Sequence, residues 1–158
     1  MAAMMFMKVT GVTGEATDDK HKDWSDIKSF SWGASQPGGM VVGGGAGRAS
    51  FNDLQVVAYM DKATPALIKH CASGLHIGSV IVHVCKSTGT KKEFCVVTLE
   101  DVLVTSAQII GVDPQDGLER LVMNYGFQSA KVRQAYTDKQ GNGASSPMGW
   151  NITENIEM

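Results

Sequence analysis

The stretch from Asp61 to Gly74, Asp-Lys-Ala-Thr-Pro-Ala-Leu-Ile-Lys-His-Cys-Ala-Ser-Gly, is the segment that most clearly predicts a helix. Thr64 is a suitable N-cap because its hydroxyl can accept a hydrogen bond from a backbone N–H without a helical partner. Pro65 suits the first helical position, and Gly74 can end the helix in the left-handed conformation. At about 100° per residue, one side of this helix is apolar and consists of Leu67, Ile68, Cys71 and Ala72. Such a short helix is marginal alone, so we expect its apolar side to lie against a sheet.

The remainder of the chain is predicted to be strand and loop. Apolar and polar residues alternate in segments spaced by roughly ten residues, which is typical of β-strands. The expected strands are 4–10, 26–34, 48–60, 76–86, 93–99, 101–110 and two within 121–137. About eight strands with one flanking helix predict a mainly β fold, either a closed barrel or a two-sheet sandwich, with antiparallel pairing through local hairpins.

The composition is that of a single globular domain spanning residues 1–158, with 43% hydrophobic and 19% charged residues. A net charge of −2 provides no electrostatic footprint for nucleic acid and no basic face for a membrane. The first residues lack the basic region of a secretory signal, and no apolar run reaches transmembrane length. We therefore expect a protein made in the cytoplasm without a signal peptide.

The predicted strand 26–34 has two different faces. Phe30 and Trp32 share one side, and Ser29 and Ser31 share the other. The aromatic side should pack into the core, where it buries a large area. The serine side must then point away from the core.

Two further segments predict an exposed loop and a strand that is buried on two faces or lies at an interface. The charged run 18–23 is interpreted as a solvated loop. In the predicted strand 76–86 both sides are apolar, which suggests burial on two faces or at a subunit interface. Exposed strand edges also need covering, and self-association is one way to cover them.

The glycine-rich segment Gly43–Gly47 invites a phosphate-loop interpretation, but the spacing excludes it. A P-loop would need glycine where Val42 stands and lysine where Arg48 stands. A dinucleotide fingerprint would also need glycine at position 48. Both motifs precede a helix, whereas a strand is expected here.

The ionisable residues give no catalytic or metal-binding pattern. The histidines share no element at ligand spacing, and the cysteines are odd in number without metal-type spacing. These residues are His21, His70, His76, His83, Cys71, Cys85 and Cys95. We expect satisfied or exposed histidines, cysteines that act as small core residues, and no catalytic, cofactor-binding or metal-binding residues.

An ordered set of short motifs resembles the Hcp family, the haemolysin-coregulated tube proteins of bacterial type VI secretion. Each motif is weak alone, but their order and spacing match over nearly the whole chain. The motifs are Phe6–Lys8, Gly14-Glu15, Asp18–His21, Phe30–Gly33, Ser35-Gln36, Gly43–Gly47, Phe51–Leu54, Tyr59–Pro65, Cys71–His76, Leu99–Val104 and Gly149–Asn151.

The resemblance implies a β-barrel with one flanking helix that assembles into homohexameric rings. Rings of this kind stack into the inner tube of a contractile injection machine, carry effector proteins in the lumen and are exported with the spike inside a sheath. The implied function is structural and transport-related rather than catalytic, without cofactors, nucleic acid or membrane insertion.

Within such a ring, two groups of residues are candidate contact sites. Ser29 and Ser31 are candidates for the channel wall, because small hydroxyl residues add neither bulk nor fixed charge. The alternative is that they merely face solvent. The candidates for subunit or ring-stacking contacts lie in the glycine-rich connector and are Met40, Val41, Val42, Gly43, Gly44 and Gly45.

Two other function classes stay open from the residues alone. A monomeric β-barrel could bind a small molecule or peptide, and an enzyme is the least favoured class. The mass of the purified particle separates a ring from a monomer. The effectors carried, the source organism, the subunit interfaces and the stability of stacked rings are not specified by this sequence.

Overall fold

The computed structural model describes residues 4–36, 49–87, 92–115, 117–137 and 146–158. The helix found in these ranges is α1 (Thr64–Ser73). The strands are β1 (Met4–Val9), β2 (Ser25–Ser31), β3 (Ala34–Ser35), β4 (Ser50–Phe51), β5 (Leu54–Tyr59), β6 (Ile77–Cys85), β7 (Glu93–Val112), β8 (Leu121–Tyr136), β9 (Ser146–Asn151) and β10 (Ile156–Glu157). Within the described residues, no helix has the length and apolarity needed to cross a membrane.

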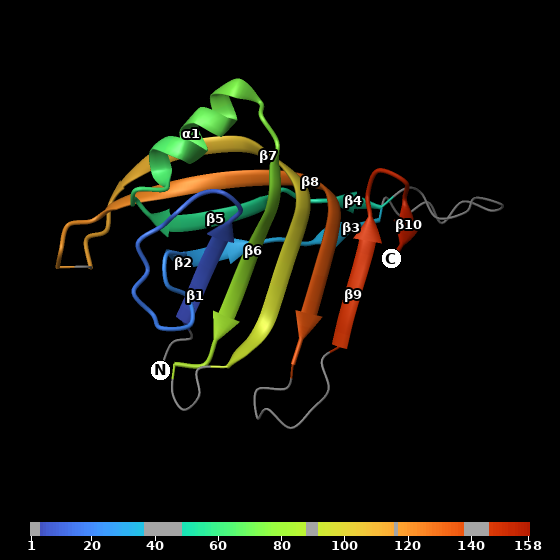
Figure 1. Ribbon diagram of the computed structural model, residues 1–158, viewed down its shortest axis with the longest axis horizontal. Coiled ribbons are helices and arrows are strands. Elements are labelled where there is room, and N and C mark those ends of the chain that lie inside the picture. The colour runs from blue at the N-terminus through green and yellow to red at the C-terminus, as the bar shows by residue number, and fades with distance from the viewer. Residues whose placement is uncertain (1–3, 37–48, 88–91, 116, 138–145) are drawn as a thin grey trace.

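Six strands close into an antiparallel barrel (Figure 1). Its order is β5-β2-β1-β6-β7, and β8 pairs with both β7 and β5 to complete the circle. The first part of β8 pairs with β5 and its last part with β9, so β9 and β10 continue the sheet outside the barrel. The predicted antiparallel barrel is confirmed, and the sandwich alternative is not.

Two strands are longer than the sequence predicts. β7 is continuous across the expected 93–99 and 101–110, and β8 is continuous across the expected pair in 121–137. Glu100 pairs with Lys131 and Val102 with Ser129, so the ladder continues past Asp101, whose φ is 56°. One residue in a left-handed conformation disturbs the alternation of a strand without ending it. In contrast, the expected strand 48–60 is divided into β4 and β5.

The helix α1 ends as predicted but begins differently. Gly74 has φ 70° and its N–H donates to the carbonyl of His70, which confirms the left-handed C-cap. The prediction that Thr64 is the N-cap is wrong, because Ala63 holds that position without a side-chain cap. The Thr64 hydroxyl instead bonds to Tyr125 at 2.6 Å, a partner on β8 that is 61 positions away.

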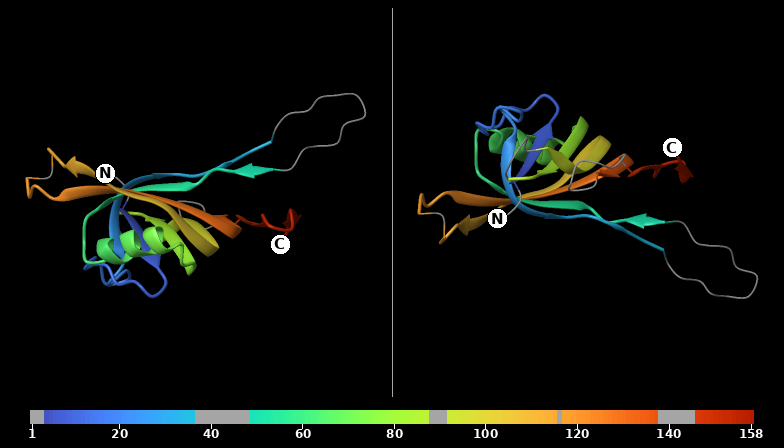
Figure 2. Two further views of the ribbon diagram at one scale, coloured as in Figure 1. Left: turned by 90° about the horizontal axis from the view of Figure 1, so that it is seen from above. Right: turned by 90° about the horizontal axis from the view of Figure 1, so that it is seen from below.

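The buried stripe of α1 is narrower than predicted. Leu67 is fully buried and belongs to the main core, and Cys71 packs against it. Ile68, by contrast, is 42% exposed and Ala72 is also exposed. α1 lies over one end of the barrel (Figures 1 and 2), and Leu67 and Cys71 are the members of its predicted apolar side that pack into or against the core.

The barrel interior forms one apolar core. Its largest fully buried side chains come from several strands and α1, and are Tyr125, Phe127, Met7, Leu54, Leu67, Leu99 and Met123. A smaller cluster on the outside joins Phe6, Ala16 and Cys85 beneath the loop between β1 and β2. This loop covers the end of β6, so the predicted burial of both faces of β6 is confirmed there for Cys85.

The prediction that 18–23 is simply a solvated loop is wrong for two of its residues. His21 is 2% exposed, and the side chain of Asp18 is 5% exposed. Backbone hydrogen bonds fold the loop onto itself, including Gly14 N–H to Asp23 O at 2.7 Å and Ala16 N–H to Trp24 O at 2.8 Å. His21 thereby turns inward toward β6, and composition alone gives no signal for that.

Candidate functional site

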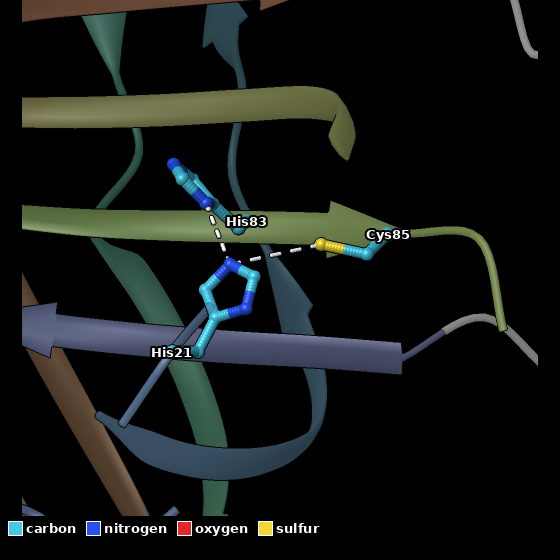
Figure 3. A group of neighbouring side chains, drawn as sticks. All are labelled: His21, His83 and Cys85. Atoms are coloured by element: carbon cyan, nitrogen blue, oxygen red, sulfur yellow. Dashed lines mark hydrogen bonds between the residues drawn. The ribbon is translucent and has the colours of Figure 1, made fainter. Parts of the chain in front are cut away.

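Three potential ligand atoms converge where the β1–β2 loop meets β6 (Figure 3). His21 Nε2 lies 3.0 Å from His83 Nδ1 and 3.8 Å from Cys85 Sγ. All three ligand atoms lie within 4.8 Å of one another. His83 and Cys85 project from β6, and His21 reaches them from the loop, so the site exists only in the folded chain.

Asp18 determines how His21 presents its ring. The Nδ1 of His21 lies 2.7 Å from Asp18 Oδ2. A carboxylate only accepts hydrogen bonds, so Nδ1–H donates to Asp18 and the lone pair of Nε2 faces His83 and Cys85. The side chains of both members of this pair are almost fully buried.

Aromatic rings surround the same site. Phe6 stacks on His21 with ring centroids 4.3 Å apart, and Trp24 contacts both His21 and His83 edge-on or tilted. Burial raises the pKa of the Cys85 thiol to about 11 and lowers the pKa of His83. Without a bound cation, both groups are therefore neutral near pH 7.

Sequence reasoning expected no metal ligands and missed this convergence. His83 and Cys85 occupy alternate positions of one strand, which places them on one face, and this was the available signal. The third group is 62 positions away from His83, and its orientation depends on the fold of the loop. The other histidines lie elsewhere: His70 bonds to the carbonyl of Ala66, and His76 lies 2.7 Å from Asp101.

The candidate channel residues Ser29 and Ser31 are both exposed on the outer face of β2. Phe30 and Trp32 pack against the core, as expected. Two rows of uncharged residues cross the sheet beside the serines. Along β2, β5, β8 and β7 these rows are Ser31, Gln55, Gly126 and Ser106, and Ser29, Val57, Asn124 and Gln108.

Two candidate contact surfaces lie on strands at opposite ends of the molecule, one at the β7–β8 extension and one at β9 (Figures 1 and 2). The far ends of β7 and β8 extend beyond the barrel and form the apolar tip, which consists of Ile109, Ile110, Val112, Leu118 and Leu121, each at least 40% exposed. On the opposite side, a groove of about 560 Å³ is lined by residues of β7, β8, β9 and the following C-terminal residues. Its lining combines apolar residues, among them Val96, Pro147 and Met158, with the charged Arg133 and Glu157.

The fold of this chain is shared with known proteins. The family model described as "Type VI secretion system effector, Hcp" matches residues 6–136. The chain belongs to the Hcp family. This confirms the resemblance inferred from the ordered motifs and places the chain among type VI secretion proteins.

Curated and solved Hcp proteins match over their full lengths. Protein hcp1 of Pseudomonas aeruginosa is 36% identical over 164 aligned residues, covering 99% of both chains. The crystal structure of Hcp1 from Salmonella typhimurium aligns with a TM-score of 0.83 at 30% identity over the whole of both chains. Another structure, described as a type six secretion system protein, aligns with a TM-score of 0.88 at 29% identity over 99% of this chain and 100% of that one.

The other candidate contact residues belong to the glycine-rich connector. Met40, Val41, Val42, Gly43, Gly44 and Gly45 lie outside the described residues. Their assignment to subunit or ring-stacking contacts stays a prediction from sequence.

Proposed function

We propose that this Hcp-family chain forms hexameric rings that stack into the inner tube of a type VI secretion machine and carry effector proteins in the channel. Membership of the family supports a tube or effector protein of type VI secretion. The observation that carries the assembly proposal is the apolar tip of β7 and β8. Monomeric proteins rarely expose a contiguous group of large apolar side chains without a binding role.

The groove at the opposite end is a suitable partner surface for the apolar tip. A contact between two different surfaces of identical chains is heterologous, and it closes into a ring when the rotation between neighbours allows. The apolar part of the groove lining suits the side chains of the tip, and Arg133 and Glu157 add charged groups beside it. Head-to-tail contacts between tip and groove would bury both surfaces in every subunit.

The uncharged rows beside Ser29 and Ser31 support a channel-wall role for this face. The pairings place serine, glutamine, asparagine and glycine next to one another across four strands. Such a surface can donate and accept many weak hydrogen bonds without a fixed charge that would select one cargo. The alternative for these serines is an outer surface that simply faces solvent.

The assembly proposal is tested by placing a charge in the apolar tip. Leu118 is 73% exposed, so Leu118→Asp should leave the barrel folded and convert rings into monomers, measured by light scattering after size exclusion. Leu75→Asp is the matched control, because Leu75 is 63% exposed beside α1 and away from the tip. Rings that persist in Leu118→Asp would exclude the tip as a subunit contact.

The channel proposal is tested with Ser31→Gln and Ser29→Gln, which add length without charge. We expect rings of normal mass and reduced retention of a co-expressed effector. Normal retention in the double variant would reject the channel-wall role, and loss of the ring would move these residues to a subunit interface. Deletion of 38–45 tests the connector separately, with the expectation that folding is kept and stacking or secretion is impaired.

The proposed function also implies partner proteins and a route of export. The stacked rings would contact spike and sheath components, and the chain would leave the cell through the type VI machine. No catalytic role is proposed. The competing function is a monomeric β-barrel that binds a small molecule or peptide, and a particle with the mass of one chain would favour it.

A further inference from the structure

The distances within the group of His21, His83 and Cys85 are close to those between the ligand atoms of a tetrahedral metal site. Zinc binds histidine nitrogen at about 2.0–2.1 Å and thiolate sulfur at about 2.3 Å, so a tetrahedral site places its ligand atoms roughly 3.4–3.6 Å apart. The observed separations are 3.0 Å between the two nitrogens and 3.8 Å between His21 Nε2 and Cys85 Sγ. Both separations are near the tetrahedral values, and all three ligand atoms lie within 4.8 Å of one another.

The surroundings of these residues are those of a built ligand set. Asp18 holds the ring of His21 so that Nε2 points at the other two groups. A carboxylate behind a ligating histidine is a recurring arrangement that orients the ring and raises its basicity as a ligand. Phe6 and Trp24 cover the same rings and limit the access of water.

We propose that His21, His83 and Cys85 bind one zinc-class divalent cation, with Asp18 orienting His21. One imidazole nitrogen from each histidine and one thiolate supply three ligands, and water on the half-exposed side of His83 supplies the fourth. Binding releases the Cys85 thiol proton to solvent. It also moves the His83 ring proton from Nδ1 to Nε2, which frees Nδ1 to coordinate the cation.

The consequence of binding is mechanical. His21 belongs to the loop between β1 and β2, whereas His83 and Cys85 belong to β6. A shared cation would fasten this loop across β1 to the barrel wall. The competing interpretation is that His21 and His83 form a metal-free hydrogen bond inside an aromatic pocket, and it predicts no specific metal binding.

Cobalt(II) is the probe, because it occupies zinc sites and reports a thiolate ligand by its charge-transfer absorption. Full-length protein is treated with a chelator, dialysed and titrated with cobalt(II). We expect one equivalent per chain, a thiolate-to-cobalt band, displacement by zinc and a higher thermal midpoint. Absence of that band in the wild-type chain overturns the proposal, even if cobalt binds elsewhere.

The variants identify the ligands. Cys85→Ser should lose the band, whereas Asp18→Asn should keep it and bind about 10–100-fold more weakly. Cys95→Ser is the matched control, because Cys95 is a partly buried cysteine of β7 outside the group, and it should bind like wild type. A band that persists in Cys85→Ser contradicts the assignment. If Cys85→Ser does not fold, the titrations of the wild-type chain and of Asp18→Asn still decide whether the proposed site binds cobalt.

Discussion

The hydroxyls of Thr64 and Tyr125 lie 2.6 Å apart and join the first turn of α1 to the first half of β8. Thr64 is 2% exposed and Tyr125 is 1% exposed, so water cannot replace this bond. Thr64 Oγ1 also accepts a hydrogen bond from the N–H of Asp61 at 3.2 Å. Burial raises the pKa of Tyr125 to about 12, which keeps its hydroxyl protonated and able to bond at physiological pH.

We expect the replacement of either hydroxyl to cost more than the loss of one ordinary hydrogen bond. Thr64→Val leaves the Tyr125 hydroxyl buried without a partner, which costs about 1–3 kcal/mol. In Thr64→Val/Tyr125→Phe, neither polar atom of the pair remains, so the double variant should lose less than the sum of the single variants. Urea unfolding at one protein concentration measures the three differences.

A matched control for this cycle is the exposed pair of Thr10 and Ser79, whose hydroxyls also lie 2.6 Å apart. Thr10→Val should change the free energy of unfolding by only about 0.5 kcal/mol, because water replaces the lost bond. Strict additivity of Thr64→Val and Tyr125→Phe would show that the two hydroxyls are not coupled.

The ion pair of Lys28 and Asp113 predicts a pH dependence. Lys28 Nζ lies 2.8 Å from Asp113 Oδ2, and this bond, with a further one from the Gln115 N–H, holds the pKa of Asp113 below its ordinary value of 3.8. The unfolded chain therefore binds more protons in this range. The stabilisation is complete above about pH 4 and is lost as the pH falls through the folded pKa.

The measurement for this prediction is the unfolding free energy of wild type and Asp113→Asn across acidic pH. The difference between them should be largest near neutral pH and shrink below about pH 4. Burial raises the pKa of Asp26, so the contribution of Asp26 should have the opposite pH dependence. A difference for Asp113→Asn that stays constant with pH would contradict the ion pair.

Gly14 is the most tightly enclosed glycine of the β1–β2 loop. A Cβ at this position would lie 2.4 Å from the carbonyl oxygen of Trp24, which is rigid backbone. We expect Gly14→Ala to cost roughly 1–3 kcal/mol, because the loop must move to relieve the clash. Thermal unfolding at one protein concentration measures the loss.

Gly33→Ala is the control for this substitution, since its nearest contact would be a side-chain atom 4.0 Å away. It should unfold close to the wild-type temperature. Equal effects of Gly14→Ala and Gly33→Ala would mean that the loop does not pack against Trp24 as described.

The fold was predictable where the signal is local. Alternation in the segment 26–34 predicts that Phe30 and Trp32 face the core, and both pack against it. Gly74 predicts the end of α1, because only its own backbone conformation is involved. The identity of the family followed from ordered motifs rather than from any single residue.

The features that the sequence predicts wrongly depend on contacts with residues that are distant in sequence. The local sequence predicts Thr64 as the N-cap, because nothing in it shows that Tyr125 lies beside the Thr64 hydroxyl in the folded chain. His21 looked solvated because its burial depends on β6 and on the fold of the preceding loop. Ile68 looked buried because helical periodicity defines a side of the helix but not the width of the surface beneath it.

The central claim is that this chain assembles into a hexameric ring, and its most direct test is the mass of the purified full-length protein in solution. Light scattering coupled to size exclusion, repeated over a range of concentrations, should give six times the mass of one chain. A particle with the mass of a single chain at every concentration tested would contradict the account.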